Sequence, residues 1–150
     1  MTVYGIILTI HIIAAVCGLG ATFALPIVMK LPRTVTQAKF ALAINEKIEK
    51  LAKLASITLL VTGLIMGALN THLFTEGWFI ASIVIYIAVQ PLVAGILPKR
   101  ARQQSQVLEQ ATSEELPEQF ISIGKQVAPI NTIVHTAAVL LIILMTIKPF

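Results

Sequence analysis

Two histidines stand inside long apolar stretches of this chain, where an imidazole needs a partner. His11 lies in LTIHIIAAVCGLGATFALP, residues 8–26, and His135 lies in the uncharged run 126–147. An unsatisfied polar group in hydrocarbon costs several kcal/mol, so each ring must either accept or donate a hydrogen bond or bind a ligand. Neutral imidazole is an axial ligand of haem iron, and bundles of helices hold haem between them.

Three interpretations of these histidines stay open. In the first, His11 and His135 are the two axial ligands of one b-type haem. In the second, they make hydrogen bonds between helices, for example from His11 to Tyr86 or from His135 to Asn131. In the third, they bind copper or zinc, although neither has a second histidine three or four residues away and the apolar runs contain no Asp or Glu.

Each apolar run carries one stripe of small or polar residues at helical spacing, which we expect to face the interior. Three glycines on these stripes are predicted to make room for a flat macrocycle, and three polar residues are predicted to donate hydrogen bonds around it. The glycines are Gly18, Gly63 and Gly67, and the polar residues are Tyr86, Gln90 and Asn131.

The elements that must position these residues follow from the charge pattern. The chain has 150 residues, of which 57% are hydrophobic and 12% are charged. A helix needs about 20 apolar residues to cross the hydrocarbon, and four charge-free runs are long enough. We predict an all-α protein, a four-transmembrane-helix up-down bundle forming one integral membrane domain over 1–150. The spans are expected at about 4–28, 54–70, 78–97 and 127–147.

The basic residues predict the orientation of this bundle. The segments after the first and third spans hold ten of the eleven Lys and Arg residues, and the turn NTHLFTEGW holds none. The positive-inside rule then places both long linkers in the cytoplasm and both termini outside. The net charge of +4 is therefore explained by topology, and no nucleic-acid partner is expected.

The linkers themselves should be partly helical. Residues 34–55 contain neither Pro nor Gly, and Phe40, Ile44, Ile48, Leu51 and Leu54 recur at helical spacing. We expect an amphipathic helix here on the cytoplasmic side, running into the second span. The start of segment 99–126 is expected to extend the third span as a helix, with SEELPEQ forming a turn.

Depth along the helices favours a common layer for the expected site. At 1.5 Å per residue, His11 and Gly63 lie about 10 Å below the outer ends of their spans, Tyr86 about 12 Å and His135 about 18 Å. This places both histidines in or near the outer half of the bilayer.

The stretch HIIAAVCGLGATFALP resembles the first span of a family of small bacterial four-span membrane proteins, and more distantly the CopD copper-resistance proteins and the HemJ-type protoporphyrinogen oxidases. The last resemblance rests on His11 and on Leu25-Pro26. It implies b-type haem bound through His11. This chain has Gly18 and Ile27 where the HemJ-type proteins have Trp and Arg, so of the residues that mark the HemJ-type site only the histidine carries over, onto His11.

The sequence therefore predicts a multi-pass protein of the bacterial inner membrane that binds haem b for electron transfer or for haem or redox sensing, with a membrane redox partner. The alternatives are a HemJ-like porphyrinogen oxidase and a non-redox copper-handling or structural subunit. The pair Gly63 and Gly67 leaves open whether close packing occurs within one bundle or between copies in a homo-oligomer. Catalysis by a Ser/His/Asp set is excluded because the chain contains no Asp.

Overall fold

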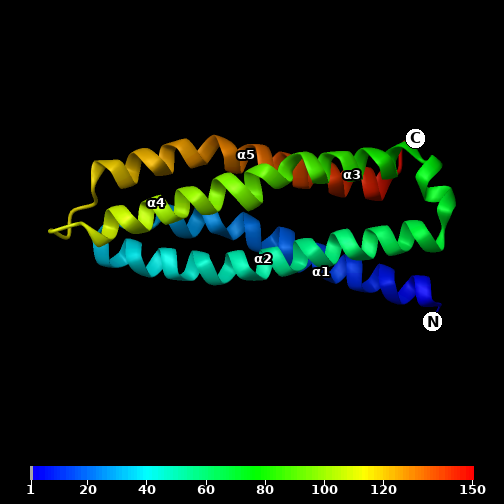
Figure 1. The fold of residues 1–150 in the computed structure, drawn as a ribbon, viewed down its shortest axis with the longest axis horizontal. Coiled ribbons are helices and arrows are strands. Elements are labelled where there is room, and N and C mark those ends of the chain that lie inside the picture. The colour runs from blue at the N-terminus through cyan, green and yellow to red at the C-terminus, as the bar shows by residue number, and fades with distance from the viewer. Residues whose placement is uncertain (1) are drawn as a thin grey trace.

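The computed structural model describes residues 2–150 as four nearly parallel helical rods (Figure 1). A short 3₁₀-helix, η1 (Thr71–Thr75), joins the second rod to the third. The third rod is built of two α-helices with a π-helical segment, η2, between them. The rods are α1 (Val3–Lys30), α2 (Val35–Leu69), the series α3 (Gly77–Gln90), η2 (Pro91–Ile96) and α4 (Leu97–Glu109), and α5 (Glu118–Ile147).

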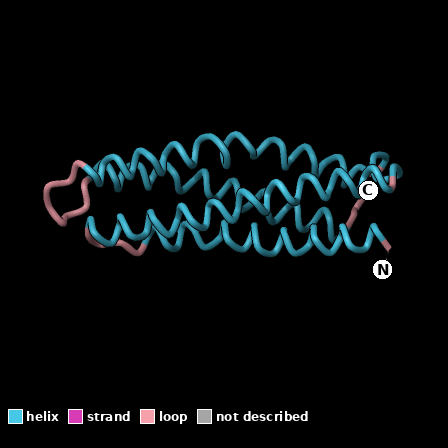
Figure 2. The backbone as a smooth tube through the Cα atoms, turned by 60° about the horizontal axis from the view of Figure 1, so that its bottom comes forward, coloured by secondary structure: helices cyan, strands magenta, loops and turns pink. Residues whose placement is uncertain are grey.

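Loops gather at the two ends of the bundle (Figure 2). We call one end the terminal end, because it holds Val3, η1 and the stretch Lys148–Phe150. We call the other the basic end, because it holds the connection 31–34 and the loop 110–117. Successive rods run in opposite directions, as predicted for an up-down bundle.

The four spans are confirmed as four helices that are long and apolar enough to cross a membrane. The helices exceed the predicted spans toward the basic end. At 1.5 Å per residue, the 35 residues of α2 extend about 52 Å, against about 30 Å of hydrocarbon. The predicted amphipathic helix 34–55 and the second span are one continuous helix, which is longer than the hydrocarbon is thick.

The part of α2 that corresponds to the predicted amphipathic helix 34–55 buries a different face from the one its large apolar residues suggest. Small side chains are buried along α2: Ala38, Ala41, Ala52 and Ala55. Phe40 and Leu54 are instead 69% and 65% exposed. Small residues let two helix backbones approach closely, and this contact decides the rotation of α2 about its axis.

The closest approach of α1 and α2 occurs at Gly18. A Cβ atom added there would lie 2.5 Å from the Cβ of Ala55. Because this is shorter than any real non-bonded carbon–carbon contact, Gly18 is required for the packing of the first hairpin. The contact between α1 and α2 is the most extensive between any two elements of the bundle.

A separate apolar cluster closes each end of the bundle. At the terminal end the cluster contains Met66, Leu73, Trp78 and Phe79. At the basic end it contains Val35, Ala38, Leu108 and Phe120. The two clusters hold the α1–α2 hairpin against the hairpin formed by the third rod and α5.

The loop 110–117 is tied to the first turn of α2. The Glu114 carboxylate accepts hydrogen bonds from the backbone N–H of Thr36 at 3.2 Å and from its hydroxyl at 2.8 Å. The backbone N–H of Val35 donates to the Glu114 carbonyl oxygen at 3.1 Å. These bonds satisfy N–H groups that a helix leaves free at its N-terminus.

Candidate functional site

His11 is buried between α1 and α2. Its side chain is 7% exposed, and its Nδ1 lies 2.7 Å from the hydroxyl oxygen of Thr62. Gly63 stands beside the ring, where an added Cβ would lie 3.6 Å from the His11 Cε1. The close contact of the two helices at Gly18 brings His11 and Thr62 within hydrogen-bond distance.

The hydrogen bonds of Thr62 bear on which ring nitrogen of His11 carries the proton. A threonine hydroxyl has one proton, and the carbonyl oxygens of Thr58 at 2.6 Å and Leu59 at 3.2 Å are both within reach of the Thr62 hydroxyl. We assign the tautomer in which this proton goes to one of the two carbonyls, so that the Thr62 oxygen accepts from Nδ1–H of His11. Nε2 is left with its lone pair, which is the arrangement of a histidine that binds a metal through Nε2.

His135 has a different environment. Its Nε2 lies 3.1 Å from the backbone carbonyl oxygen of Thr22 on α1. A carbonyl oxygen only accepts, so His135 donates through Nε2, and this nitrogen has no lone pair free for iron while the bond is in place. Its ring also stacks on Phe23, with the ring centroids 4.4 Å apart and the planes inclined by 21°.

The structure does not bring the two histidines together. His11 and the His135 partner Thr22 are 11 residues apart on α1, which is about 16 Å along the helix axis. Counting residues from the outer end of each helix predicts that both histidines lie in or near one layer, because it takes the outer ends of α1 and α5 to be level. Thr22, which bonds to His135, lies 19 residues from the start of α1, whereas His135 lies 12 residues from the end of α5. The start of α1 therefore lies about 10 Å farther out than the end of α5. Ligation of one iron by both rings stays a prediction that would require these helices to move.

Tyr86 lies between these two levels, on α3. Its hydroxyl donates to the Ser56 carbonyl oxygen at 2.7 Å, and the Ser56 hydroxyl bonds to the Tyr86 oxygen. Tyr86 therefore links the two hairpins and does not bond to His11. Asn131 lies one turn from His135 on α5, and Gln90 is the last residue of α3.

Two of the three glycines expected to make room for a macrocycle are filled by neighbours. Gly18 is packed against Ala55, and a Cβ at Gly67 would lie 2.8 Å from the Phe74 ring and 3.1 Å from that of Phe79. Gly63 alone of the three adjoins a histidine. The structure therefore assigns Gly18 and Gly67 to helix packing.

Thr62 is the site residue that the sequence did not reveal. It is 5% exposed and 51 residues away from His11. Threonine is also common on lipid-facing helix surfaces, where its hydroxyl bonds to the preceding turn, so its type alone marks no site. Only the pairing of α1 with α2 identifies it.

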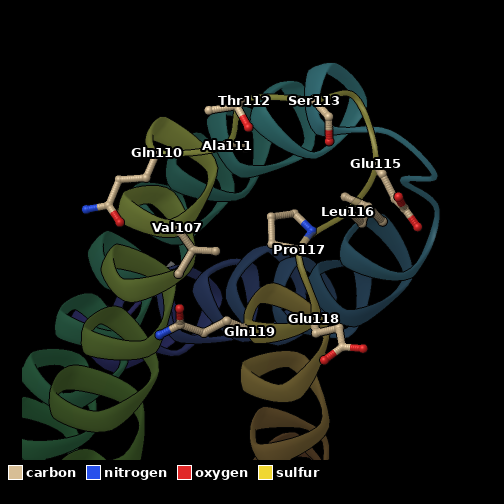
Figure 3. Close-up of a pocket in the computed structure, with 10 residues that line it drawn as sticks. All are labelled: Val107, Gln110, Ala111, Thr112, Ser113, Glu115, Leu116, Pro117, Glu118 and Gln119. Atoms are coloured by element: carbon tan, nitrogen blue, oxygen red, sulfur yellow. The ribbon is translucent and has the colours of Figure 1, made fainter.

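An open pocket of about 470 Å³ lies at the basic end, far along the bundle from His11. Residues of α4, the loop 110–117 and the start of α5 line it, among them Gln110, Ser113, Glu115 and Gln119 (Figure 3). No histidine lines it. Its side chains are those of a solvated loop, and it does not coincide with the predicted site.

Within residues 2–150, no group of three or more His, Cys, Asp or Glu side chains could hold a metal ion. Structural and catalytic zinc sites use three or four protein ligands. Haem brings four nitrogen ligands of its own and needs one or two from the protein. A single imidazole with a free Nε2 lone pair is enough for the one ligand that haem needs, but it is too few for a zinc site.

Comparison with protein families gives one match over nearly the whole chain. Residues 5–149 match the family described as predicted integral membrane protein, DUF2269. The chain belongs to this family. No curated protein and no solved structure matches this DUF2269 member. The match agrees with the four apolar helices, and it adds no support to the resemblance to the CopD and HemJ-type proteins.

Proposed function

We propose that this membrane protein binds b-type haem through Nε2 of His11. The observation that supports the proposal is the hydrogen bond between His11 Nδ1 and Thr62, which in the assigned tautomer leaves the lone pair of Nε2 free on a side chain that is 7% exposed. Haem supplies one-electron chemistry when it is bound. The role proposed for the protein is therefore electron transfer, or sensing of haem or redox state, within the membrane.

The residues around His11 would orient the ligand ring. Thr62 holds the imidazole through Nδ1, and the bond from Thr62 to the Thr58 carbonyl fixes the direction of the hydroxyl. Such outer hydrogen bonds fix the tautomer of a ligating histidine and raise its basicity. Gly63 keeps the space beside the ring free of a side chain.

The proposed orientation places the basic end of the bundle in the cytoplasm, as the positive-inside rule requires. His11 lies eight residues from the start of α1, about 12 Å from the terminal end. Any electron donor or acceptor would then approach from within the membrane or from its outer side.

An optical spectrum of the detergent-purified protein, made with ample haem supply, tests the proposal. We expect a Soret band in the oxidised protein and sharp α and β bands after reduction with dithionite. His11→Ala should abolish these bands. His72→Ala is the matched control, because the side chain of His72 is 74% exposed in η1. Identical spectra for wild type and His11→Ala, or no visible absorbance in either, would refute haem binding at His11.

A second candidate function is favoured by the completeness of the hydrogen bonds. His11, Tyr86 and His135 each have a partner on another helix. A polar interior that only joins the helices of a structural subunit would show this pattern. Under that function the purified protein is colourless, and His11→Ala lowers its stability without any spectral change.

A further inference from the structure

The partner of His135 is a carbonyl group that helix α1 itself cannot satisfy. In an α-helix the carbonyl of residue i accepts from the N–H of residue i+4. The residue four positions after Thr22 is Pro26, which lies inside α1 and has no N–H. His135 of α5 donates to this same carbonyl oxygen at 3.1 Å.

We infer that His135 is a latch between the two hairpins, replacing the backbone donor that Pro26 removes from α1. An unsatisfied backbone carbonyl in hydrocarbon has a large cost in free energy, so the bond from His135 stabilises α1 by giving the Thr22 carbonyl a donor. Stacking on Phe23, the residue next to Thr22, holds the imidazole in place. The latch joins residues 113 positions apart in the chain.

The latch borders a layer in which each of three rods contains a proline within its helical stretch. Pro26 lies inside α1 about 6 Å from Thr22, and Pro129 lies inside α5 about 9 Å from His135, both toward the basic end. The third rod contains the π-helical segment η2, which begins at Pro91 and contacts α5. Prolines and π-turns are where helices bend.

This arrangement gives the latch a conformational consequence. The terminal side of the layer contains His11 and the apolar cluster around Trp78, while the basic side contains the apolar cluster around Leu108. With the bond from His135 to Thr22 in place, α1 and α5 are fixed to each other where bending would begin. Without it, the basic-end segments of α1 and α5 gain freedom relative to each other.

A double-mutant cycle tests whether the latch replaces the missing N–H. His135→Phe keeps an aromatic ring for stacking on Phe23 and removes the donor. We expect it to lower the folding equilibrium constant by about 3- to 20-fold in SDS-induced unfolding, the range of hydrogen bonds between membrane helices. Pro26→Ala restores the backbone N–H, so in the Pro26→Ala background His135→Phe should lower the folding equilibrium constant less than twofold. Equal losses in both backgrounds would overturn the inference.

Two further variants keep the test decisive. Thr62→Val removes a different bond between helices, so its cost should be the same in the wild-type and Pro26→Ala backgrounds. His135→Gln retains a side-chain donor and should lose less than His135→Phe while Pro26 is present. If His135→Phe does not fold, a loss for His135→Gln that is unaffected by Pro26→Ala would equally contradict the latch.

Spin labels measure whether the bond from His135 to Thr22 restricts the basic ends of α1 and α5 relative to each other. In a Cys17→Ser background, labels at Leu31→Cys and Gln119→Cys, both exposed, report the distance between the basic ends of α1 and α5. We expect His135→Phe to broaden this distance distribution and Thr62→Val to leave it unchanged. A distribution that His135→Phe does not alter would refute the locking role, whatever the spectrum of the protein shows at His11.

Discussion

Replacement of Gly18 by alanine should disrupt the contact that aligns α1 with α2. The added Cβ would lie 2.5 Å from the Ala55 Cβ. Carbon atoms in contact prefer separations of about 3.5–4.0 Å, so the two helices would have to separate by about 1–1.5 Å at this point. Overpacking of this kind costs about 1–3 kcal/mol, because neither backbone can give way as a flexible side chain would.

The effect should reach His11, which is seven residues away on the same helix. Its bond to Thr62 is 2.7 Å long and depends on the separation of the same two helices. We expect Gly18→Ala to lower the free energy of unfolding by about 1–3 kcal/mol, measured by SDS titration in mixed micelles and followed by circular dichroism. If haem binds at His11 as proposed, Gly18→Ala should also weaken the absorbance that depends on His11.

Two variants control this measurement. Gly20→Ala lies on the same helix, two residues farther along, where an added Cβ meets nothing within 4 Å. It should be neutral or slightly stabilising, since alanine is the better helix former. Gly18→Ala combined with Ala55→Gly transfers the methyl group from one helix to the other and should recover most of the loss. If Gly18→Ala is as stable as Gly20→Ala, the close approach of α1 and α2 at Gly18 is refuted.

Two further predictions concern the ends of the bundle. Hydrogen bonds from the Thr36 hydroxyl and backbone N–H lower the pKa of Glu114 below its usual 4.5, so this cap stabilises the basic end above that pH and is lost as the pH falls through the lowered pKa. Proteolysis of the loop 110–117 should therefore accelerate in wild type as the pH falls below 4.5 and through the lowered pKa of Glu114, whereas Glu114→Gln should be cut at a rate that changes less across this range; equal pH profiles would contradict the role of the cap. At the terminal end, a Cβ at Gly77 would lie 2.5 Å from the ring of Phe150. The backbone oxygen of Phe150 accepts a hydrogen bond from the Trp78 N–H at 3.0 Å. Gly77→Ala should displace Phe150 and shift the fluorescence of Trp78, the single tryptophan of the chain, and an unchanged emission spectrum would show that Phe150 does not pack there.

The sequence alone determined the fold class and the number of spans. Four charge-free runs, each long enough to cross the hydrocarbon, leave few alternatives, because every backbone group must be satisfied within a helix there. The helical continuation of the third span past Pro98 was also predictable. The face that α2 buries was not, because large apolar residues such as Phe40 suggested one side while the alanine stripe packs on the other.

The partners of the two histidines were decided only by the tertiary structure. The sequence identified His11 and His135 as rings that need partners, and it placed them at similar depths by counting along each helix. Their actual partners, Thr62 and the Thr22 carbonyl, are 51 and 113 residues away. Which groups meet depends on the rotation and axial offset of each helix, and contacts such as Gly18 with Ala55 set these in three dimensions. Hydropathy and spacing within one helix carry no information about that offset.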